Sequence, residues 1–467
     1  MIFRQFYLES LGHASYLVGS EETGEAFVLD VRRDVDQYFD FARANELSIR
    51  FAADTHQHND YLTGITELKQ RSPLELLAGS RAELGYRARR LDDGARLRMG
   101  EIEFEVLHTP GHTPEHVSFL VRDLARGEEP VLLFSGGALL VDDVARPDLL
   151  GGTADTQQAA ATLGRTLQEK ILPLPDHVLV YPTHVAGSLC GGNIGSMLVT
   201  TVGYEKRLNE LARCAAETDG DAFAERCLDL DTLPTVPGYW RRMRRQNQDG
   251  PQPLGVLSNP PALDVDEFAR RRDEGAVVLD CRQPEAFGGG HIPGSINVGL
   301  GSSFPTWAGS VLPEDRPVLL LLDRPDDLWD VCWHLLRIGY DLPRGWLAGG
   351  MMAWRIAGRD IERVAQWTVG ELDERKDSAA APFVLDVRQP DEWAAGHIPG
   401  AHHISGAELT ERLDEIPAQR PVAVYCGSGF RSSVACSLIK AAGKELVFNV
   451  LGGFTAWQAR DLPVAAD

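Results

Sequence analysis

An internal repeat in the C-terminal part of the chain constrains its fold more than any other feature of the sequence. Each copy carries a D-x-R block, then G-H-I-P-G, and later G-G-x-x-x-W. In both copies the histidine follows the first aspartate by eleven residues. The anchors are Asp280, His291 and Trp354 in the first copy and Asp386, His397 and Trp457 in the second. Three shared blocks in one order predict two homologous domains of the same fold.

The repeat divides the chain into three predicted domains. Residues 246–366 contain the first repeat, residues 367–467 contain the second, and residues 1–245 form a separate, larger domain. The stretch 246–255 is rich in Gln, Asn, Gly and Pro, which predicts a linker or a wrapping segment. Within each repeat, short apolar runs alternate with helical segments, so we expect an α/β fold with a parallel sheet and helices on both faces.

The first domain has a different pattern, in which apolar runs are mostly separated by turns. These runs predict strands at 27–31, 101–107, 117–121, 131–134 and 178–181, and helices are expected at 35–46, 65–71 and 156–171. The pattern indicates a sheet-rich α/β layer protein.

Composition restricts the partners and the compartment. Lys and Arg number 46 against 68 Asp and Glu, and the net charge of −22 argues against nucleic acid and anionic membranes as partners. No apolar run of about eighteen residues predicts a membrane span, and the N-terminus lacks the pattern of a secretory signal. Seven cysteines without a C-x-x-C pair predict free thiols in a reducing cytoplasm.

Cys426 stands where an apolar strand at 421–425 gives way to a helix that begins near Ser432. The backbone N–H groups of such a loop, the helix N-terminus and Arg431 all stabilise a thiolate. The same groups would bind the anionic end of thiosulfate or of a persulfide. We therefore expect Cys426 and Arg431 to be catalytic. The expected substrate-binding residues are Gly427, Ser428, Gly429, Phe430 and Ser432.

The second repeat, with D-x-R, G-H-I-P-G-A, C-x-x-x-x-R-S and G-G-x-x-x-W in order, resembles a rhodanese domain. The resemblance implies that Cys426 takes up sulfane sulfur as a persulfide and passes it to a thiol or to a cyanide-like acceptor. It also implies that Asp386 and Arg388 hold the loop and do not react.

The first repeat departs from this pattern. Leu322 or Asp323 falls at the position of the cysteine, and Asp327 falls at that of Arg431. Acidic residues would repel an anionic persulfide. We interpret this repeat as a non-catalytic rhodanese-like spacer or docking unit, in which Cys281 is buried.

Histidines of the first domain gather in short motifs that follow apolar segments. The motifs are T-H-Q-H-N-D-Y at 55–61, H-T-P-G-H-T-P-E-H at 108–116 and Y-P-T-H at 181–184. Because histidines at the ends of separate strands can converge, they predict a metal site. The expected ligands are His56, His58 and His112, with Asp60 and His184 as further candidates.

These motifs, with G-H-A-S-Y at 12–16 and A-G-S-L-C-G at 186–191, resemble the metallo-β-lactamase fold, an αββα sandwich. Within that fold the chain is similar, from end to end, to persulfide dioxygenases fused to tandem rhodanese domains. The resemblance implies iron- and oxygen-dependent oxidation of a thiol persulfide to sulfite, and a homo-oligomer.

One ligand of that family is missing from this sequence. The family holds Fe(II) on two histidines, which map onto His56 and His112, and on an aspartate, which maps onto Gly137. A set of His56, His58 and His112 would still accept zinc or Fe(II), with weaker affinity, and an empty site is the alternative.

Three functional hypotheses remain open. The first is a sulfur-metabolism enzyme that acts on low-molecular-weight thiol persulfides or thiosulfate, with sulfur transfer at Cys426. The second is a metal-dependent thioester or lactone hydrolase, which Gly137 and Tyr61 weigh against because a second metal would need ligands there. The third is a metal-free sulfur carrier or scaffold protein.

Overall fold

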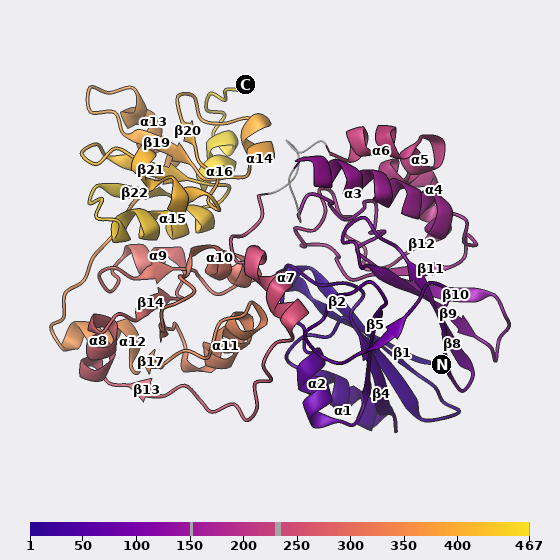
Figure 1. Ribbon diagram of the computed structural model, residues 1–467. Coiled ribbons are helices and arrows are strands. Elements are labelled where there is room, and N and C mark those ends of the chain that lie inside the picture. Colours follow the sequence, from indigo (N-terminus) through magenta and orange to yellow (C-terminus); the bar gives the residue numbers. More distant parts are fainter. Residues whose placement is uncertain (150–152, 229–234, 467) are drawn as a thin grey trace. The chain divides into compact units, whose positions relative to one another are not determined.

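The computed structural model describes residues 1–149, 153–228 and 235–466 (Figure 1). Its contacts divide the chain into two compact units. The first unit comprises Met1–Leu233 with Trp240–Leu257, and the second comprises Pro234–Tyr239 with Ser258–Asp467.

The first unit contains two six-stranded sheets, with strand orders β1-β2-β3-β4-β5-β6 and β12-β11-β10-β9-β8-β7. The first sheet consists of β1 (Ile2–Leu8), β2 (His13–Gly19), β3 (Glu25–Leu29), β4 (Ser48–Ala53), β5 (Glu75–Gly79) and β6 (Arg89–Leu91). The second consists of β7 (Arg96–Met99), β8 (Ile102–His108), β9 (Val117–Asp123), β10 (Pro130–Gly136), β11 (Leu179–Pro182) and β12 (Thr200–Thr201).

Side chains on the strands alternate between the two faces of each sheet, and this alternation allows two sheets and two helix layers to stack. On β3, Phe27 and Leu29 belong to the apolar core between the sheets, whereas Val28 packs against α1 (Asp36–Ala44) and α2 (Ile65–Arg71). On β9, Phe119 faces the same inner core and Leu120 packs against α3 (Thr153–Thr166) and α6 (Gly220–Cys227). The expected αββα sandwich is therefore confirmed. The remaining helices are η1 (Glu9–Leu11), η2 (Leu167–Ile171), α4 (Val202–Leu208) and α5 (Glu210–Glu217).

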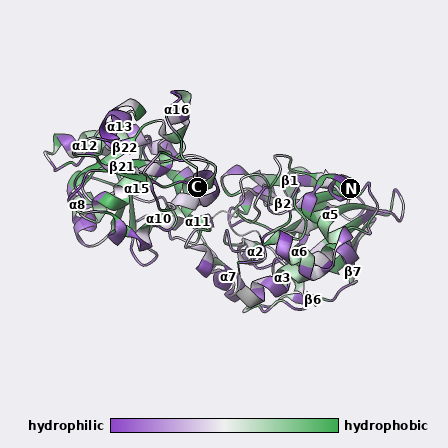
Figure 2. Ribbon diagram, turned by 90° about the horizontal axis from the view of Figure 1, so that it is seen from above, coloured by the Kyte–Doolittle hydropathy of each residue, from purple (hydrophilic) through white to green (hydrophobic). Residues whose placement is uncertain are grey.

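Helix α7 (Trp240–Asp249) and the chain after it pack onto the first unit. The helix is among the hydrophilic stretches in Figure 2, but it buries Trp240, Met243 and Asn247. After it, the C=O of Pro251 accepts from the hydroxyl of Thr66, and the C=O of Gln252 accepts from Arg33. The stretch at 246–255 thus wraps around the first unit.

The second unit contains two five-stranded sheets in which every pair of neighbouring strands is parallel. The first repeat has the order β13-β17-β16-β14-β15, and the second has β18-β22-β21-β19-β20. The strands are β13 (Ala262–Leu263), β14 (Val277–Asp280), β15 (Ile296–Asn297), β16 (Val318–Leu321), β17 (Trp346–Leu347), β18 (Ala365–Trp367), β19 (Phe383–Asp386), β20 (His402–His403), β21 (Val422–Tyr425) and β22 (Val447–Val450). The same strand order in both repeats confirms that they share one fold.

Helices accompany both sheets of the second unit. In the first repeat they are α8 (Val265–Asp273), α9 (Pro284–Gly288), α10 (Phe304–Val311), η4 (Pro325–Asp327), α11 (Leu328–Arg337) and α12 (Gly350–Ile356). In the second they are α13 (Val369–Lys376), α14 (Pro390–Ala394), η5 (Leu409–Glu411), η6 (Leu413–Glu415), α15 (Phe430–Ala441) and α16 (Gly453–Ala459). Across the described residues of both units, every helix is too short or too polar to cross a membrane.

Candidate functional site

The candidate metal site of the first unit is built from residues that follow the C-terminal ends of strands in both sheets. In the first sheet β3 and β4 are parallel, and they lead to Asp30 and His56. In the second sheet β10 and β11 are parallel, and they lead to Gly137 and His184. Strand β8 is antiparallel to β9, as β10 is, and leads to the loop that carries His112.

Three groups of side chains in the described part of the chain bring ligand atoms within 4.8 Å of one another. His56, His112 and His184 form a fully buried group made only of histidines. The others are His58, Asp60 and His184, and Asp30, Asp54 and His58. The structure therefore joins His56 and His112 to His184, and the expected set of His56, His58 and His112 is not among these groups.

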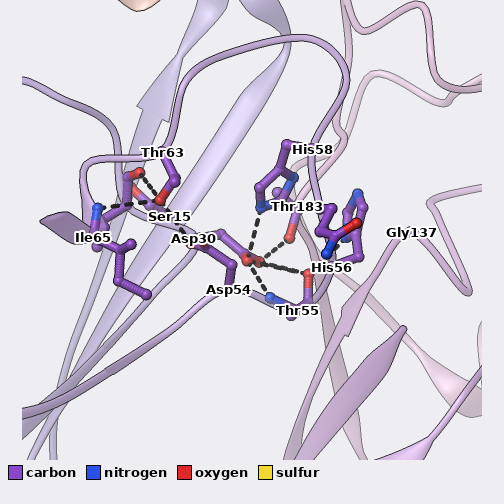
Figure 3. A network of polar contacts seen from close by, with 12 residues as sticks. Ser15, Asp30, Asp54, Thr55, His56, His58, Thr63, Ile65, Gly137 and Thr183 are labelled. Carbon is purple, nitrogen blue, oxygen red and sulfur yellow. Dashed lines mark hydrogen bonds and ion pairs between the residues drawn. The ribbon is translucent and has the colours of Figure 1, made fainter. Parts of the chain in front are cut away.

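Asp30 engages His58 (Figure 3). Nε2 of His58 lies 3.2 Å from Oδ1 of Asp30, and both side chains are buried. The same carboxylate accepts from the N–H of Thr55 at 2.6 Å and from the hydroxyl of Thr183. A buried carboxylate is stable only with such partners. This requirement explains why His58 is directed to Asp30 and does not complete a ligand set with His56 and His112.

Gly137 leaves no space for the family's carboxylate. A Cβ atom there would lie 2.6 Å from Cδ2 of His112 and 3.2 Å from Cβ of Ala145. The backbone N–H of Gly137 instead donates to Nε2 of His116 at 2.8 Å. A ligand set of two histidines and one aspartate does not fit these residues, whereas a histidine set does. Asp30 and His116 were not predicted from the sequence as residues of the site, although His116 ends the motif at 108–116.

The environment keeps two of these imidazoles neutral. Burial and the neighbouring histidines lower the pKa of His56 well below its ordinary value. Burial and His184 lower the pKa of His112 to about 3. Both rings therefore keep a lone pair for a metal ion at neutral pH. Burial also acts to lower the pKa of His184, but Cys190 and Asp60 hold it above its ordinary value.

Asn247 of α7 fixes the loop that follows β4. Its side-chain amide donates to the C=O groups of His58 and Tyr61, both at 2.8 Å, and its Oδ1 accepts from the N–H of Thr63 at 2.9 Å. Nothing in the local sequence pattern predicts these contacts, because α7 lies 184 or more residues further along the chain.

Glu115, in the loop that carries His112, links α7 to the loop that carries His56. Its carboxylate accepts from the N–H of Gln57 and from Arg244 of α7, each at 3.0 Å. A small cavity adjoins His56 and is lined in part by Glu115 and Asn247. Contacts with α7 thus stabilise the loops that carry His56 and His112.

In the second unit, the sulfur of Cys426 lies inside the loop that joins β21 to α15. The residue is 1% exposed. The N–H of Gly429 donates to Sγ at 3.1 Å, and the hydroxyl of Ser432 does so at 3.5 Å. Gly429 has a φ of 117°, which residues with a Cβ rarely adopt, so glycine is needed for this N–H to turn inwards. Of the other expected binding residues, Ser428 is exposed and Gly427 and Phe430 are half-buried.

Arg431, at the start of the helix that follows the thiol loop, pairs with a carboxylate. Both of its Nη atoms donate to Glu392 of α14, one of them at 2.8 Å. Burial acts to raise the pKa of Glu392, but Arg431 holds it below its ordinary value. Burial acts to lower the pKa of Arg431, but Glu392 holds it above its ordinary value. Glu392 was not predicted from the sequence, because it lies 39 residues before its partner.

Asp386 and Arg388 form a buried pair behind the loop. Nη2 of Arg388 donates to Asp386 at 2.6 Å and to the C=O of Gly396 at 2.7 Å. The guanidinium also lies 4.0 Å from the ring centre of Phe454. These contacts are structural, in agreement with the sequence analysis.

Strand register places Leu322 of the first repeat at the position of Cys426. Leu321 pairs with Asp280 as Tyr425 pairs with Asp386, and the next residue is Leu322 in one repeat and Cys426 in the other. The loop before the helix runs over 322–327 in the first repeat and over 426–429 in the second. Asp327 lies in that longer loop and pairs with Arg324 at 2.6 Å. The first repeat thus lacks the thiol, and Cys281 is buried as expected.

The first repeat contacts the helix that follows Cys426. The hydroxyl of Ser433 on α15 donates to Oδ1 of Asn297 at 2.6 Å, and the N–H of Asn297 donates to Ser437 at 3.0 Å. Asn297 in turn donates to the C=O groups of Asp280 and Arg282. The repeat without the thiol therefore supports the helix of the repeat that has it.

The fold and these two sites define a metallo-β-lactamase-like domain joined to two rhodanese-like domains. The model of the rhodanese-like domain family matches residues 264–357 and 368–460. The persulfide dioxygenase ETHE1, mitochondrial, of Bos taurus is 30% identical over 216 residues, which are 45% of this chain and 75% of that protein. A sulfurtransferase of Allochromatium vinosum is 37% identical over 95 residues, which are 20% of this chain and 89% of that protein.

A solved structure described as a metallo-beta-lactamase from Staphylococcus aureus subsp. aureus COL matches a larger share of the chain. It has a TM-score of 0.65 and 32% identity, and the match covers 74% of this chain and 98% of that one. The chain belongs to the family of metallo-β-lactamase-fold persulfide dioxygenase homologues fused to rhodanese domains.

Proposed function

We propose that the protein transfers sulfane sulfur through a persulfide on Cys426, with thiosulfate or a low-molecular-weight thiol persulfide as donor, in the cytoplasm. The contact between Sγ of Cys426 and the N–H of Gly429, 3.1 Å long, carries this proposal. An inward N–H, the helix N-terminus and Arg431 together stabilise negative charge at one point.

The proposed transfer has two steps. The Cys426 thiolate attacks the outer sulfur of thiosulfate, the S–S bond of the donor breaks, and sulfite leaves with the electron pair. An acceptor thiolate or cyanide then attacks the outer sulfur of the cysteine persulfide, and the Cys426 thiolate is regenerated. Arg431 and the N–H of Gly429 are placed to offset the charge on the transferred sulfur.

The test is sulfur loading of the purified full-length protein with thiosulfate, followed by release with cyanide. We expect about one releasable sulfur per chain, and we expect Cys426→Ser to remove it. Cys436→Ser is the matched control, since that thiol is buried within α15. Loading that persists in Cys426→Ser would contradict the proposal.

We further propose that the histidine group of the first unit binds a divalent metal ion, Fe(II) or Zn(II). Its buried imidazoles are of the type that both ions accept. Bound iron would supply oxygen activation, and the similarity to a persulfide dioxygenase makes persulfide oxidation the second candidate function. Persulfide-dependent oxygen uptake by the iron-loaded protein tests it, and the absence of uptake leaves sulfur transfer as the function.

Thioester or lactone hydrolysis has less support. A second metal would need ligands at Gly137 and Tyr61, and the hydroxyl of Tyr61 instead donates to the C=O of Asp30 at 3.1 Å. Thioester turnover that is lost in His112→Ala would favour the hydrolase after all.

A further inference from the structure

We infer that His56, His112 and His184 hold the metal ion of the first unit through their Nε2 atoms, with His184 in place of the missing carboxylate. The inference deepens the proposed metal binding and rests on it. It is independent of sulfur transfer at Cys426.

The first observation is that each of the three rings has its Nδ1 atom near a polar or charged group of the protein. Nδ1 of His56 lies 2.9 Å from the hydroxyl of Thr55, and Nδ1 of His112 lies 2.9 Å from the C=O of Arg146. Nδ1 of His184 lies 3.4 Å from Oδ2 of Asp60. Carbonyl, hydroxyl and carboxylate partners of this kind orient metal-binding histidines and leave the other nitrogen for the ion.

The second observation is the distance between the nitrogens that remain. Nε2 of His184 lies 3.2 Å from Nε2 of His56, and His112 contributes a ligand atom within 4.8 Å of both. Zinc–imidazole bonds of roughly 2.0–2.1 Å place two nitrogens on one ion about 3–4 Å apart. The observed spacing is therefore that of ligands able to share an ion.

The third observation weighs against His58 as the third ligand, because His58 is not grouped with His56 and His112 among the described side chains whose ligand atoms lie within 4.8 Å of one another. Nε2 of His58 is engaged by Asp30 at 3.2 Å. The buried carboxylate of Asp30 is bound by His58, Thr55 and Thr183 (Figure 3). If His58 turned away to bind a metal ion, this carboxylate would lose one of its partners.

The ligand set also indicates the class of ion. Three imidazole ligands with an open position are typical of catalytic zinc sites, whereas non-haem iron oxygenases use two histidines and a carboxylate. The site should therefore prefer Zn(II) or Co(II) to Fe(II). With no ligand carboxylate, the ion keeps its full charge towards an anion such as a thiolate or a hydroxide.

The test is a metal titration of the metal-free full-length protein, with zinc competed against a chromophoric chelator and cobalt followed by its visible spectrum. We expect one equivalent of zinc to bind and the cobalt bands to be lost in His184→Asn. His58→Asn is the matched control and should change zinc affinity only a few-fold. Asp60→Asn, which removes the charge of the carboxylate beside Nδ1 of His184, should weaken zinc binding by roughly 10- to 100-fold. Circular dichroism of each metal-free variant verifies folding.

Two results would overturn the assignment. Full zinc affinity in both His184→Asn and Asp60→Asn, with loss in His58→Asn, would restore the set of His56, His58 and His112. A native protein that binds neither zinc nor cobalt would remove both the assignment and the proposed metal site. In either case the loading of Cys426 with sulfur would stand as a separate result.

Discussion

A side chain at position 137 would have to displace the ring of His112, whose Nδ1 lies 2.9 Å from the C=O of Arg146. We therefore expect Gly137→Asp to fail to create an iron site of two histidines and a carboxylate. Overpacking of this kind costs roughly 1–3 kcal/mol of stability. Thermal unfolding and iron content of the purified variant measure both effects. Gly137→Ala adds the Cβ without the charge and should destabilise similarly. Tighter iron binding by Gly137→Asp than by the native protein would contradict this prediction.

Arg431 should contribute to sulfur transfer mainly through its charge. Replacing it by Gln removes a charged hydrogen-bond donor, an interaction of roughly 1.5–3 kcal/mol. We expect kcat/KM for thiosulfate to fall by about 10- to 100-fold in Arg431→Gln, as measured by thiocyanate formation with cyanide. Arg431→Lys keeps the charge but loses the two-pronged contact with Glu392, and it should retain more activity. Equal losses in both variants would show that the shape of the side chain matters more than its charge.

At the level of single residues, sequence motifs identified the thiol loop better than the histidine site. The loop was predictable because Cys426, Gly429 and Arg431 are close in sequence, and the geometry of a strand, a tight loop and a helix is local. His184 could not be preferred to His58 in the same way. That choice depends on Asp30, which lies 28 residues before His58 and is brought beside it by the pairing of β3 with β4.

Helix α7 should stabilise the ligand loop through one buried amide. Asn247→Ala removes hydrogen bonds to the backbone of His58, Tyr61 and Thr63 and leaves buried polar groups without partners. We expect a loss of roughly 2–4 kcal/mol in the free energy of unfolding of the first unit, measured by urea denaturation. Gln248→Ala, one position further along the helix and only half-buried, is the control and should cost less than about 1 kcal/mol.

Helices and strands with a regular spacing of apolar residues were predictable from the sequence. Strands that form only because they pair with another strand were not. The expected helix at 65–71 corresponds to α2, and the expected strand at 117–121 corresponds to β9, which ends at Asp123. Strands β1 and β2 were not anticipated. β1 mixes Arg4 and Gln5 with apolar residues, and its strand character comes from seven paired positions with β2. Pairing of this kind cannot be read from either segment alone.

At the scale of the whole molecule, repeat and motif arguments determined the architecture because they draw on many positions at once. Two copies of three blocks predicted two domains of one fold, and the alternation of apolar runs with helical segments predicted the parallel sheet of each. The alternation of Phe27, Val28 and Leu29 shows how a single strand serves both the inner core and a helix layer. The role of the first repeat was not predictable, because the support that Asn297 gives to α15 joins residues 136 and 140 positions apart.

Buried histidines in both units should make the molecule sensitive to acid. Burial lowers the pKa of His13 to about 3 in the first unit and that of His291 to about 4 in the second. The folded pKa lies below the unfolded value, so the unfolded chain binds more protons in this range. Stability is therefore lost as the pH falls through about 6.5 and continues to fall towards 4.

Tryptophan fluorescence can follow this loss in the second unit, because Trp240 is the only one of the nine tryptophans in the first unit. Between pH 7 and pH 5, His291 should account for about 2 kcal/mol of lost unfolding free energy. We expect His291→Gln to remove that part of the pH dependence, while the exposed His177→Gln keeps it. The slope of the unfolding free energy against pH is compared between native and variant proteins. This comparison cancels the general effect of protonating a chain of net charge −22. The same slope in His291→Gln as in the native protein would mean that His291 binds its proton equally well folded and unfolded.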